Sequence, residues 1–384
     1  MDGPMEGHAR TTIELEQSAI ACDELGPARI VQVYEPNLGL KAALVVDNVA
    51  IGPSIGGVRM APDVSIAECA RLARAMTFKN AVAGLRHGGG KAVLYGDPKM
   101  PKAAKEQLIR ALARALQHDE DYIFGPDMGT DEECMAWVKD EIGRAVGLPE
   151  SLGGIPLDEI GATGWGLRHA ADVAAGYCGL RLHGARIAVQ GFGAVGKHAA
   201  RFLAAEGAVL VAAADSTATI HDSNGLDIEA LATWKNAGKP FADYRRGEKL
   251  GRDAVVEVAC DIWIPAARPD VLNADNVRRL KAKMVLQGAN IPATAEAEEY
   301  LHRQGILTVP DFIANAGGVI CAAMEYQGLG ESAAFQAIAE KIAHNTKLVL
   351  EEAKARNILP RQAALDLATS RVKAAMATRR FAIF

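Results

Sequence analysis

Cysteine is scarce in this chain of 384 residues, and its spacing argues against two kinds of site. The six cysteines are scattered, with no C-x-x-C pair and no histidine cluster beside them. A disulfide framework or a structural zinc site needs such clustering. Scattered thiols are typical of reduced cytosolic proteins, so we expect a cytoplasmic location. We expect free, mostly buried thiols at Cys22, Cys69, Cys134, Cys178, Cys260 and Cys321.

Long apolar runs and blocks of basic residues are also missing. No uninterrupted apolar stretch approaches the ~20 residues of a membrane span. Residues 1–10 lack the apolar core of a signal peptide. Lysine and arginine do not cluster and the formal net charge is −5, so we expect no nucleic acid and no membrane as partners. The nine histidines show no H-E-x-x-H or other paired spacing, and no metal is expected.

The composition is typical of a globular protein, and one segment of the chain marks a boundary between two domains. Apolar residues make up 49% and charged residues 23%, and the length favours two domains. Glycine and proline gather at 147–156, which we take as the boundary. Before it, Ser65 and Glu68 form the capping box of a helix with an apolar face. The pattern predicts strands at 29–35, 40–46 and 92–95 and helices at 65–85 and 102–117.

Beyond the boundary, helices and short apolar runs alternate. This alternation predicts an α/β fold, with a parallel sheet covered by helices on both faces. The last stretch of about 55 residues is helical in pattern and rich in Ala, Lys and Glu. We predict helices at 161–178 and 194–205, strands at 185–190 and 208–214, and further apolar runs at 254–264, 283–287 and 306–309.

A glycine motif of the form G-x-G-x-x-G stands between the predicted strand 185–190 and the helix that follows. In this setting the first glycine permits a tight turn, the second lets the backbone approach a pyrophosphate, and the third lets helix and strand pack closely. The helix N-terminus then attracts the phosphate charge. The alternative is a glycine-rich turn without a ligand. The full strand–helix–strand context favours a dinucleotide site at Gly191, Phe192, Gly193, Ala194, Val195 and Gly196.

Asp215 ends the next predicted strand, 24 residues after Gly191. A carboxylate at this place accepts a hydrogen bond from the ribose 2′-hydroxyl of NAD and repels the 2′-phosphate of NADP. No arginine or lysine follows closely, since the next residues are Ser, Thr and Ala. The sequence therefore predicts NAD as the cofactor, without excluding NADP.

A second glycine run, Gly88 to Gly90, comes directly before Lys91. It looks like a phosphate loop, but the spacing from Gly84 is one residue too long, and Ala92 stands where a metal-binding Ser or Thr is needed. These departures argue against an ATP-dependent enzyme. Glycines also let a backbone approach a small ligand closely, and we interpret the run in this way.

Lys79 and Lys91 frame this segment, and both have apolar neighbours in the sequence. Two ammonium groups in one apolar site repel each other, and desolvation disfavours the charged form, so the pKa of one lysine should fall. A lysine tuned in this way can act as a general base, while the other stays charged and holds a carboxylate. From spacing alone, two unrelated surface lysines remain the alternative.

Several motifs occur in the order found in a known family, the glutamate, leucine, phenylalanine and valine dehydrogenases, which the chain resembles from about residue 30 to 330. They are GPSIGGVRM at 52–60, MTFKNA at 76–81, GGGK at 88–91, GPDMGT at 125–130, ATG at 162–164, QGFGAVG at 190–196 and NAGGV at 315–319. The resemblance implies a Rossmann-type domain preceded by a substrate domain, with C-terminal helices that return to the first domain. We place a substrate-binding and oligomerisation domain at 1–147, the Rossmann-type domain at 148–356 and the returning helix at 357–384.

The resemblance also implies roles for the residues in these motifs. Lys79 would hold the α-carboxylate of the substrate with the backbone of Gly56 and Gly57, Lys91 would be the catalytic base, and Asp127 would carry protons to and from the amino nitrogen. The reaction would be NAD-dependent oxidative deamination of an L-amino acid to a 2-oxo acid and ammonia. A homo-oligomer is expected by analogy. Further contacts with the cofactor would come from Thr163, Asn290 and Asn315.

Two positions depart from the glutamate-specific members that this chain resembles. Those members carry a lysine where Ile55 stands and a serine where Ala322 stands. A side-chain carboxylate would be buried here without partners, which is costly, so we predict an apolar substrate side chain. Gly125 and Ala322 are small, which suggests a pocket that admits an aromatic ring.

Three alternatives stay open at this point. One is a glutamate dehydrogenase whose carboxylate partner has moved to another position. One is a non-catalytic, NAD-binding regulatory relative, against which the presence of Lys79, Lys91 and Asp127 argues. In the third, Ile55 and Ala322 only pack the core.

Overall fold

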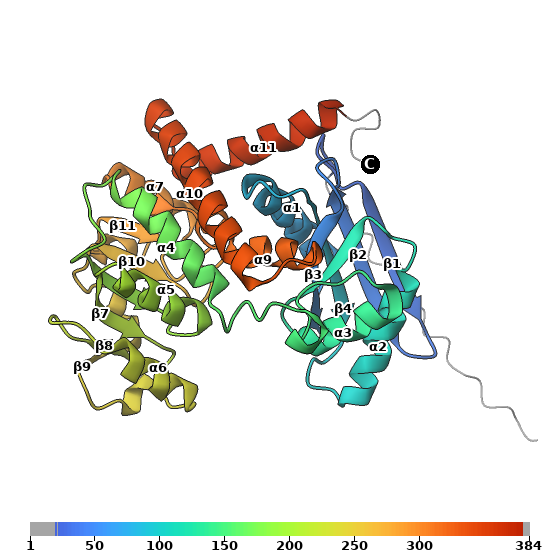
Figure 1. The fold of residues 1–384 in the computed structure, drawn as a ribbon, viewed down its shortest axis with the longest axis horizontal. Helices are drawn as coiled ribbons and strands as arrows, with labels where there is room; N and C mark the ends of the chain where they lie inside the picture. Colours follow the sequence, from blue (N-terminus) through green and yellow to red (C-terminus); the bar gives the residue numbers. More distant parts are fainter. Residues whose placement is uncertain (1–19, 21, 379–384) are drawn as a thin grey trace, which may run out of the picture.

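The computed structural model describes Ile20 and residues 22–378, which form two mixed α/β domains lying side by side (Figure 1). The fold class predicted from the alternating pattern is therefore confirmed. The prediction about a signal peptide at 1–10 lies outside the described residues, as do residues 379–384 of the predicted C-terminal segment.

The first domain is built on a mixed five-stranded sheet of order β1-β2-β4-β3-β5. The pairs β1/β2 and β2/β4 are antiparallel, while β3 runs parallel to both β4 and β5. Its elements are β1 (Arg29–Glu35), β2 (Leu40–Asn48), β3 (Ser54–Ala61), α1 (Ile66–Val82), β4 (Gly88–Tyr95), α2 (Lys102–Ala115), β5 (Tyr122–Pro126) and α3 (Glu132–Ile142).

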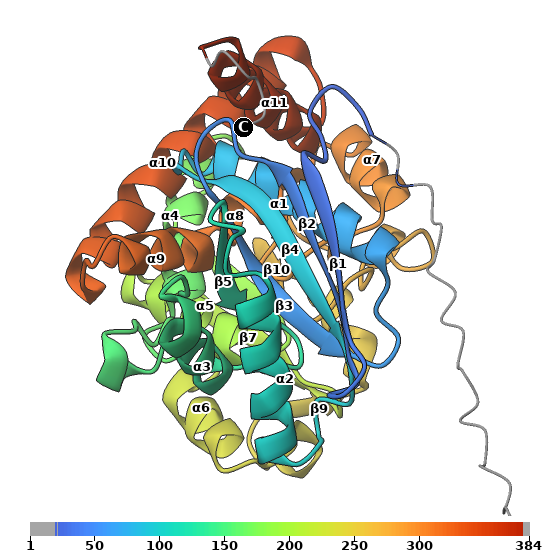
Figure 2. The same cartoon turned by 90° about the vertical axis from the view of Figure 1, so that its right-hand side faces the viewer.

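Helices cover both faces of this sheet (Figure 2). Alternate side chains of a strand point to opposite faces, so Leu44 packs with the helices α2 and α3 while Val45 packs with α1. Helix α1 begins where the sequence predicts, because the Ser65 side chain accepts a hydrogen bond of 3.1 Å from the amide of Glu68. Lys79 lies in the last turn of this helix.

Two predicted boundaries are wrong, and both errors have a local cause. Strand β4 begins at Gly88 instead of residue 92, because the three glycines pair with β2 and β3 and continue the sheet. The apolar run at 254–264 is divided: Arg252–Val256 is a 3₁₀ turn, and only Ile262–Pro265 forms a strand. Apolar character alone did not distinguish a packed turn from a strand.

The second domain is built on a seven-stranded sheet of order β12-β11-β10-β6-β7-β8-β9. The five strands from β12 to β7 are parallel, and β8 and β9 add an antiparallel edge. Its elements are α4 (Ala162–Ala175), β6 (Arg186–Gln190), α5 (Ala194–Ala205), β7 (Val209–Ala214), β8 (Thr219–His221), α6 (Ile228–Asn236), β9 (Glu248–Leu250), β10 (Ile262–Pro265), β11 (Met284–Leu286), α7 (Ala295–Arg303), β12 (Leu307–Val309), α8 (Asp311–Ala314) and α9 (Gly317–Tyr326).

Two C-terminal helices connect the domains. Helix α10 (Glu331–Arg356) packs on α4 and α9, and α11 (Pro360–Thr378) packs on α1 of the first domain (Figure 1). Arg371 of α11 donates hydrogen bonds of 3.1 and 2.7 Å to the carbonyls of Ala81 and Val82. The C-terminal segment therefore returns to the first domain, as predicted.

The segment between the domains is held by one buried carboxylate. Glu325, at the end of α9, accepts a hydrogen bond of 3.1 Å from the amide of Leu148 and another of 3.1 Å from the amide of Ile155. Both ends of the connecting segment are therefore fixed to α9. Among the described residues, no helix is both long and apolar enough to span a membrane.

Candidate active site

The structure brings the two predicted lysines to the same side of the first sheet. Lys91 lies in the middle of β4, on the face covered by α1, and is only 6% exposed. Lys79 comes from the last turn of α1. Burial lowers the pKa of Lys79 to about 8, Asp311 opposes this shift, and Lys91 adds to it. The sequence pattern predicts that the lysine with the lowered pKa is the base. This prediction is not met, because the deeply buried ammonium group is that of Lys79, the lysine predicted to hold the carboxylate.

Lys91 forms an ion pair with Asp127, the residue that follows β5. Lys91 Nζ lies 2.9 Å from Asp127 Oδ2, and the same oxygen accepts a 2.8 Å hydrogen bond from Nε of Arg59. Burial acts to raise the pKa of Asp127, but Lys91 and Arg59 outweigh it and hold the pKa below its usual value. Asp127 is therefore a charged carboxylate between two cations.

Arg59 is the member of this group that the sequence reasoning did not assign. Its guanidinium joins Asp127 to Glu68, whose Oε1 lies 2.5 Å from Nη1. The available signal was its place in the motif GPSIGGVRM, two residues after Gly57, which is predicted to hold the substrate. Arg59 and Lys91 thus contact the same oxygen of Asp127, and together they fix its position.

Gly57 keeps open the space in front of the Lys91–Asp127 pair. A Cβ atom on Gly57 would lie 3.2 Å from Lys91 Nζ and 2.7 Å from Asp127 Cβ. A side chain there would fill the space beside the ammonium group. Tyr122 fixes the backbone on the other side, because its hydroxyl donates a 2.7 Å hydrogen bond to the carbonyl of Gly56.

The glycines before Lys91 serve the fold, which corrects the prediction that they approach a ligand. A Cβ on Gly89 would lie 2.0 Å from the amide nitrogen of Thr77 in α1, and one on Gly88 would lie 1.8 Å from the carbonyl oxygen of Asn48 in β2. These partners are atoms of the protein's own backbone. The run thus lets α1 and β2 pack tightly on β4, and this packing sets the position of Lys91.

Lys79 links the two domains through a chain of amides. Its ammonium group donates a 2.7 Å hydrogen bond to Oδ1 of Asn315, which follows α8. Nδ2 of Asn315 in turn donates to Oδ1 of Asn290 at 2.9 Å and to the carbonyl of Gly288 at 3.3 Å. Asn315 and Asn290, both predicted to contact the cofactor, therefore contact each other, and Asn315 also contacts the residue predicted to hold the substrate.

Thr163 lies close to this group, in the first turn of α4. A Cβ on Gly318 of α9 would lie 3.6 Å from Thr163 Oγ1, and one on Gly317 would lie 2.2 Å from the carbonyl oxygen of Ala162. The glycines of the NAGGV motif thus let the start of α9 pack against the start of α4.

The geometry of the G-x-G-x-x-G segment fits a dinucleotide. Gly191 has φ +96°, which an L side chain rarely adopts, and a Cβ on Gly196 would lie 2.0 Å from the carbonyl oxygen of Gly191. Gly193, at the N-terminus of α5, has open space where its Cβ would point. Open space at a helix N-terminus is what a pyrophosphate requires.

The remaining members of that segment differ in what they expose. The Phe192 side chain is only 2% exposed and packs in the core, so only its backbone can meet a ligand. Ala194 begins α5, and Val195 lies against Gly288, whose Cβ would be 3.2 Å from Val195 Cγ1. The segment therefore offers its backbone and the helix end, while its large side chain supports the fold.

Asp215 stands at the end of β7, at the predicted place, but its carboxylate is already engaged. Oδ2 lies 2.7 Å from Nζ of Lys235 and accepts a 2.9 Å hydrogen bond from the amide of Phe241. Oδ1 accepts from the amide and hydroxyl of Thr217 and from the amide of Ala218. Burial opposes the shift, but these partners, Lys235 first, lower the pKa of Asp215 to about 2. Lys235 was not foreseen, because it lies 20 residues further along the chain.

The residues predicted to meet the substrate side chain lie in the apolar core between the domains. Ile55 is 4% exposed and pairs in register with Ile123 of β5, and Ala322 of α9 is half-buried against the same core cluster. Gly125 has room for a Cβ, whose nearest neighbour would be Val146 Cγ2 at 3.6 Å. Gly125 thus lies beside Val146, and Ile55 and Ala322 pack in the same large apolar cluster as Val146.

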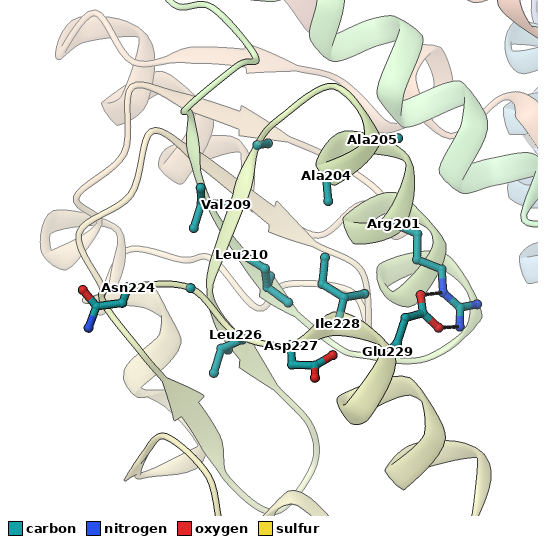
Figure 3. Close-up of a pocket in the computed structure, with 12 residues that line it drawn as sticks. Arg201, Ala204, Ala205, Val209, Leu210, Asn224, Leu226, Asp227, Ile228 and Glu229 are labelled. Carbon is teal, nitrogen blue, oxygen red and sulfur yellow. Dashed lines mark hydrogen bonds and ion pairs between the residues drawn. The ribbon is translucent and has the colours of Figure 1, made fainter.

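A surface hollow of about 730 Å³ lies elsewhere, between α5 and the segment leading into α6 (Figure 3). Its rim carries the ion pair of Arg201 with Glu229, and apolar side chains such as Leu210 and Leu226 line it. None of the predicted site residues lines this hollow. Within the part of the chain that the structure describes, no three His, Cys, Asp or Glu side chains gather so as to hold a metal ion.

A buried lysine–carboxylate pair and a dinucleotide-type fold in one chain fit an oxidoreductase. The family is shown by two matches: residues 153–380 match the Glutamate/Leucine/Phenylalanine/Valine dehydrogenase model, and residues 27–144 match the Glu/Leu/Phe/Val dehydrogenase dimerisation domain. The chain belongs to this family, and it is an amino-acid dehydrogenase acting on CH–NH₂ donors. Members of the family use NAD or NADP.

Similar proteins agree on the family and differ in substrate. A glutamate dehydrogenase of Aeropyrum pernix is 36% identical over 357 residues, covering 86% of this chain and 85% of that protein. The structure of hetero-hexameric glutamate dehydrogenase from Thermus thermophilus, in a Leu-bound form, has a TM-score of 0.80 and 31% identity, and the match covers 91% and 89% of the two chains. L-tryptophan dehydrogenase from Nostoc punctiforme has a TM-score of 0.72 and 25% identity over 92% and 97%.

Proposed function

We propose that this protein catalyses NAD-dependent oxidative deamination of an L-amino acid with an apolar side chain. The observation that carries the proposal is the buried pair of Lys91 and Asp127, with Lys79 on the same side of the sheet. In the overall reaction, amino acid, NAD⁺ and water give a 2-oxo acid, an ammonium ion, NADH and one proton. The bound nicotinamide supplies the acceptor for the hydride that leaves Cα.

The side chains divide the remaining work. Lys79 binds the substrate carboxylate, whose charge replaces the solvation that burial removes from the ammonium group. Lys91, in its neutral form, accepts a proton from the water that attacks the iminium carbon, and Asp127 moves protons to and from the nitrogen. Arg59 keeps Asp127 charged after Lys91 has lost its proton, because its own charge does not depend on pH in this range.

The cofactor is held by the backbone of the Gly191–Gly196 segment at the start of α5 and by the amide group of Asn315 and Asn290. Thr163, whose side chain lies beside Gly318, completes this set. The open space at Gly193 and the positive φ of Gly191 support this assignment.

The apolar substrate follows from what surrounds the site. Ile55 and Ala322 contribute only carbon atoms to the core between the domains, and an unpaired side-chain carboxylate there would be costly. The L-tryptophan dehydrogenase likeness is consistent with a roomy apolar pocket. Glutamate is the second candidate, since the similar proteins from Aeropyrum pernix and Thermus thermophilus are glutamate dehydrogenases by name.

A panel of amino acids tests this proposal. Phenylalanine, leucine and valine should each give a kcat/KM with NAD at least about tenfold above that of glutamate, because a hydrophobic site rejects an unpaired charge strongly. NADH formation followed at 340 nm measures it. Preference for glutamate would overturn the apolar assignment and leave the dehydrogenase assignment standing.

We also propose a preference for NAD, but the structure weakens the argument that the sequence made from Asp215. Asp215 is at the end of β7, but Lys235 neutralises it and five donors occupy its oxygens. Lys235→Ala leaves Asp215 Oδ2 with only the hydrogen bond from the Phe241 amide, so this oxygen can also accept from the ribose hydroxyl, and it removes the cation that would attract a 2′-phosphate. We expect the ratio of kcat/KM for NAD over NADP to rise by about fivefold to tenfold.

Lys239→Ala is the matched control for this change. Lys239 lies near the same helix, over the ring of Trp234 and exposed, and has no ion pair with Asp215. An unchanged NAD/NADP ratio in Lys235→Ala would show that the ribose does not approach this carboxylate.

We also propose that the protein assembles as a homo-oligomer. The first domain matches a dimerisation domain, and its edge strand β1 exposes Ile30 by 38% and Tyr34 by 53%. An exposed edge strand with apolar side chains is available for pairing. Light scattering at assay concentrations tests this, and a monomer would contradict it.

A further inference from the structure

The loop between β11 and α7 holds one residue in an unusual backbone conformation. Ile291 has φ +42°, a value that β-branched residues adopt only under constraint, and its side chain is 55% exposed. Ile291 directly follows Asn290, which accepts the hydrogen bond from Asn315. The left-handed residue thus sits next to a residue that the proposed function assigns to the cofactor.

The backbone of Ile291 is held from both sides. Its amide donates a 2.7 Å hydrogen bond to Oδ2 of Asp311, and its carbonyl accepts one of 3.0 Å from the amide of Asp270. Asp311 is only 5% exposed and begins α8. Because the left-handed conformation is unfavourable for isoleucine by itself, the acceptor that fixes its amide must be rigid.

Arg361 of α11 provides that rigidity. Its Nη2 lies 2.9 Å from the second oxygen of Asp311, and its Nε and Nη2 contact the two oxygens of Glu298 at 2.6 and 2.7 Å. Glu298 is 3% exposed, so two buried carboxylates share one guanidinium. Without Arg361 these two buried carboxylates would repel each other in a region of low dielectric, and Asp311 would have to move.

The same carboxylate residue is tied to the proposed active site. The amide of Asn315 donates a 2.7 Å hydrogen bond to the backbone carbonyl of Asp311, and Asn315 contacts both Lys79 and Asn290. Displacement of Asp311 would therefore shift the loop that carries Asn290. Arg361 itself contacts none of the proposed cofactor residues.

We propose that Arg361 is a positioning residue for the dinucleotide: through Asp311 it holds the Asn290–Ile291 loop in its left-handed conformation and so fixes the cofactor contacts of Asn290. The inference rests on the proposed function, since it concerns the residues that would hold the cofactor. Its consequence is that a residue at the start of the C-terminal helix sets the affinity of a site in another part of the sequence.

Arg361→Gln tests the proposal in the full-length protein. The dissociation constant for NADH, measured by its fluorescence without amino acid, should rise by about tenfold, the size of effect expected when a strained conformation is released. Hydrogen exchange of the ligand-free protein should become faster in the peptide that covers residues 287–294. With saturating NAD, kcat and the KM for the amino acid should stay within about threefold of wild type.

Arg356→Gln is the matched control. Arg356 lies just before the same helix and forms exposed ion pairs with Glu352 and Asp366, remote from Asp311. This variant should bind NADH and exchange hydrogen as the wild type does. If Arg361→Gln does not fold, Arg361→Lys carries the test: one ammonium group cannot span both carboxylates, so we expect weaker NADH binding and faster exchange, to a smaller extent.

A second substitution separates positioning from a general structural role. Asparagine adopts positive φ more readily than isoleucine. We therefore expect the double variant Ile291→Asn/Arg361→Gln to bind NADH almost as tightly as Ile291→Asn alone. Wild-type affinity in both Arg361 variants, or no rescue by Ile291→Asn, would overturn the inference. Absence of NADH and NADPH binding in the wild type would instead refute the proposed function.

Discussion

Replacement of Lys91 by methionine should lower kcat by at least about 10³-fold while NADH binding stays unchanged. Removal of a general base costs about 10²- to 10⁴-fold. Asp127 is a poor substitute, because Arg59, which remains in the variant, acts to lower the pKa of Asp127 and makes it a weak base. Methionine retains the shape of the side chain. The fold should survive, because Asp127 keeps its 2.8 Å hydrogen bond from Arg59 and methionine fits an apolar strand position.

The measurement for Lys91→Met has three parts. Steady-state rates give kcat, NADH fluorescence gives cofactor affinity, and thermal unfolding gives Tm. Lys354→Met, on the exposed side of α10, is the control for loss of a lysine and should behave as wild type. If Lys91→Met deaminates the substrate at more than about a tenth of the wild-type rate, Lys91 is not the catalytic base.

The Rossmann-type half of the molecule could be predicted because its signals are local. Short apolar runs, helical spacing and the G-x-G-x-x-G segment lie within a stretch of about 30 residues, and helix α5 (Ala194–Ala205) has the predicted bounds. The capping of α1 by Ser65 is likewise a contact over three residues. Local periodicity determines such elements whatever the rest of the chain does.

The contacts that make the site could not be predicted, because they join distant residues. Lys79 meets Asn315 across 236 positions, and Lys235 meets Asp215 across 20. In each case the partner is fixed by the packing of whole elements, which no spacing rule describes. The glycine run shows the same limit: its meaning depended on α1 and β2 lying against β4, and from the sequence alone a ligand and a packed helix are equally good reasons for glycine.

Lys79→Met should raise the KM for the amino acid by about 100-fold, with a smaller effect on kcat. The ammonium group is the proposed partner of the substrate carboxylate, and loss of one member of a buried, hydrogen-bonded charge pair costs several kcal/mol, here at the low end because the backbone at Gly57 remains. The variant also loses the 2.7 Å hydrogen bond from Lys79 to Asn315, but it no longer buries a charge, so we expect only a small change in stability. Burial lowers the pKa of Lys79 to about 8, so its charge costs stability below that pH, and methionine removes the cost.

The same pKa gives the binding site a pH dependence with a definite sign. Below pH 8 Lys79 is charged and binds a carboxylate; above pH 8 it loses its proton, and the affinity falls by about tenfold for each pH unit. The Ki of a carboxylic acid that resembles the substrate but lacks the amino group measures this without interference from an ionising amine. Lys79→Arg should abolish the dependence, because a guanidinium stays charged throughout this range. A Ki that stays constant from pH 7 to 10 in the wild type would show that Lys79 does not hold the carboxylate.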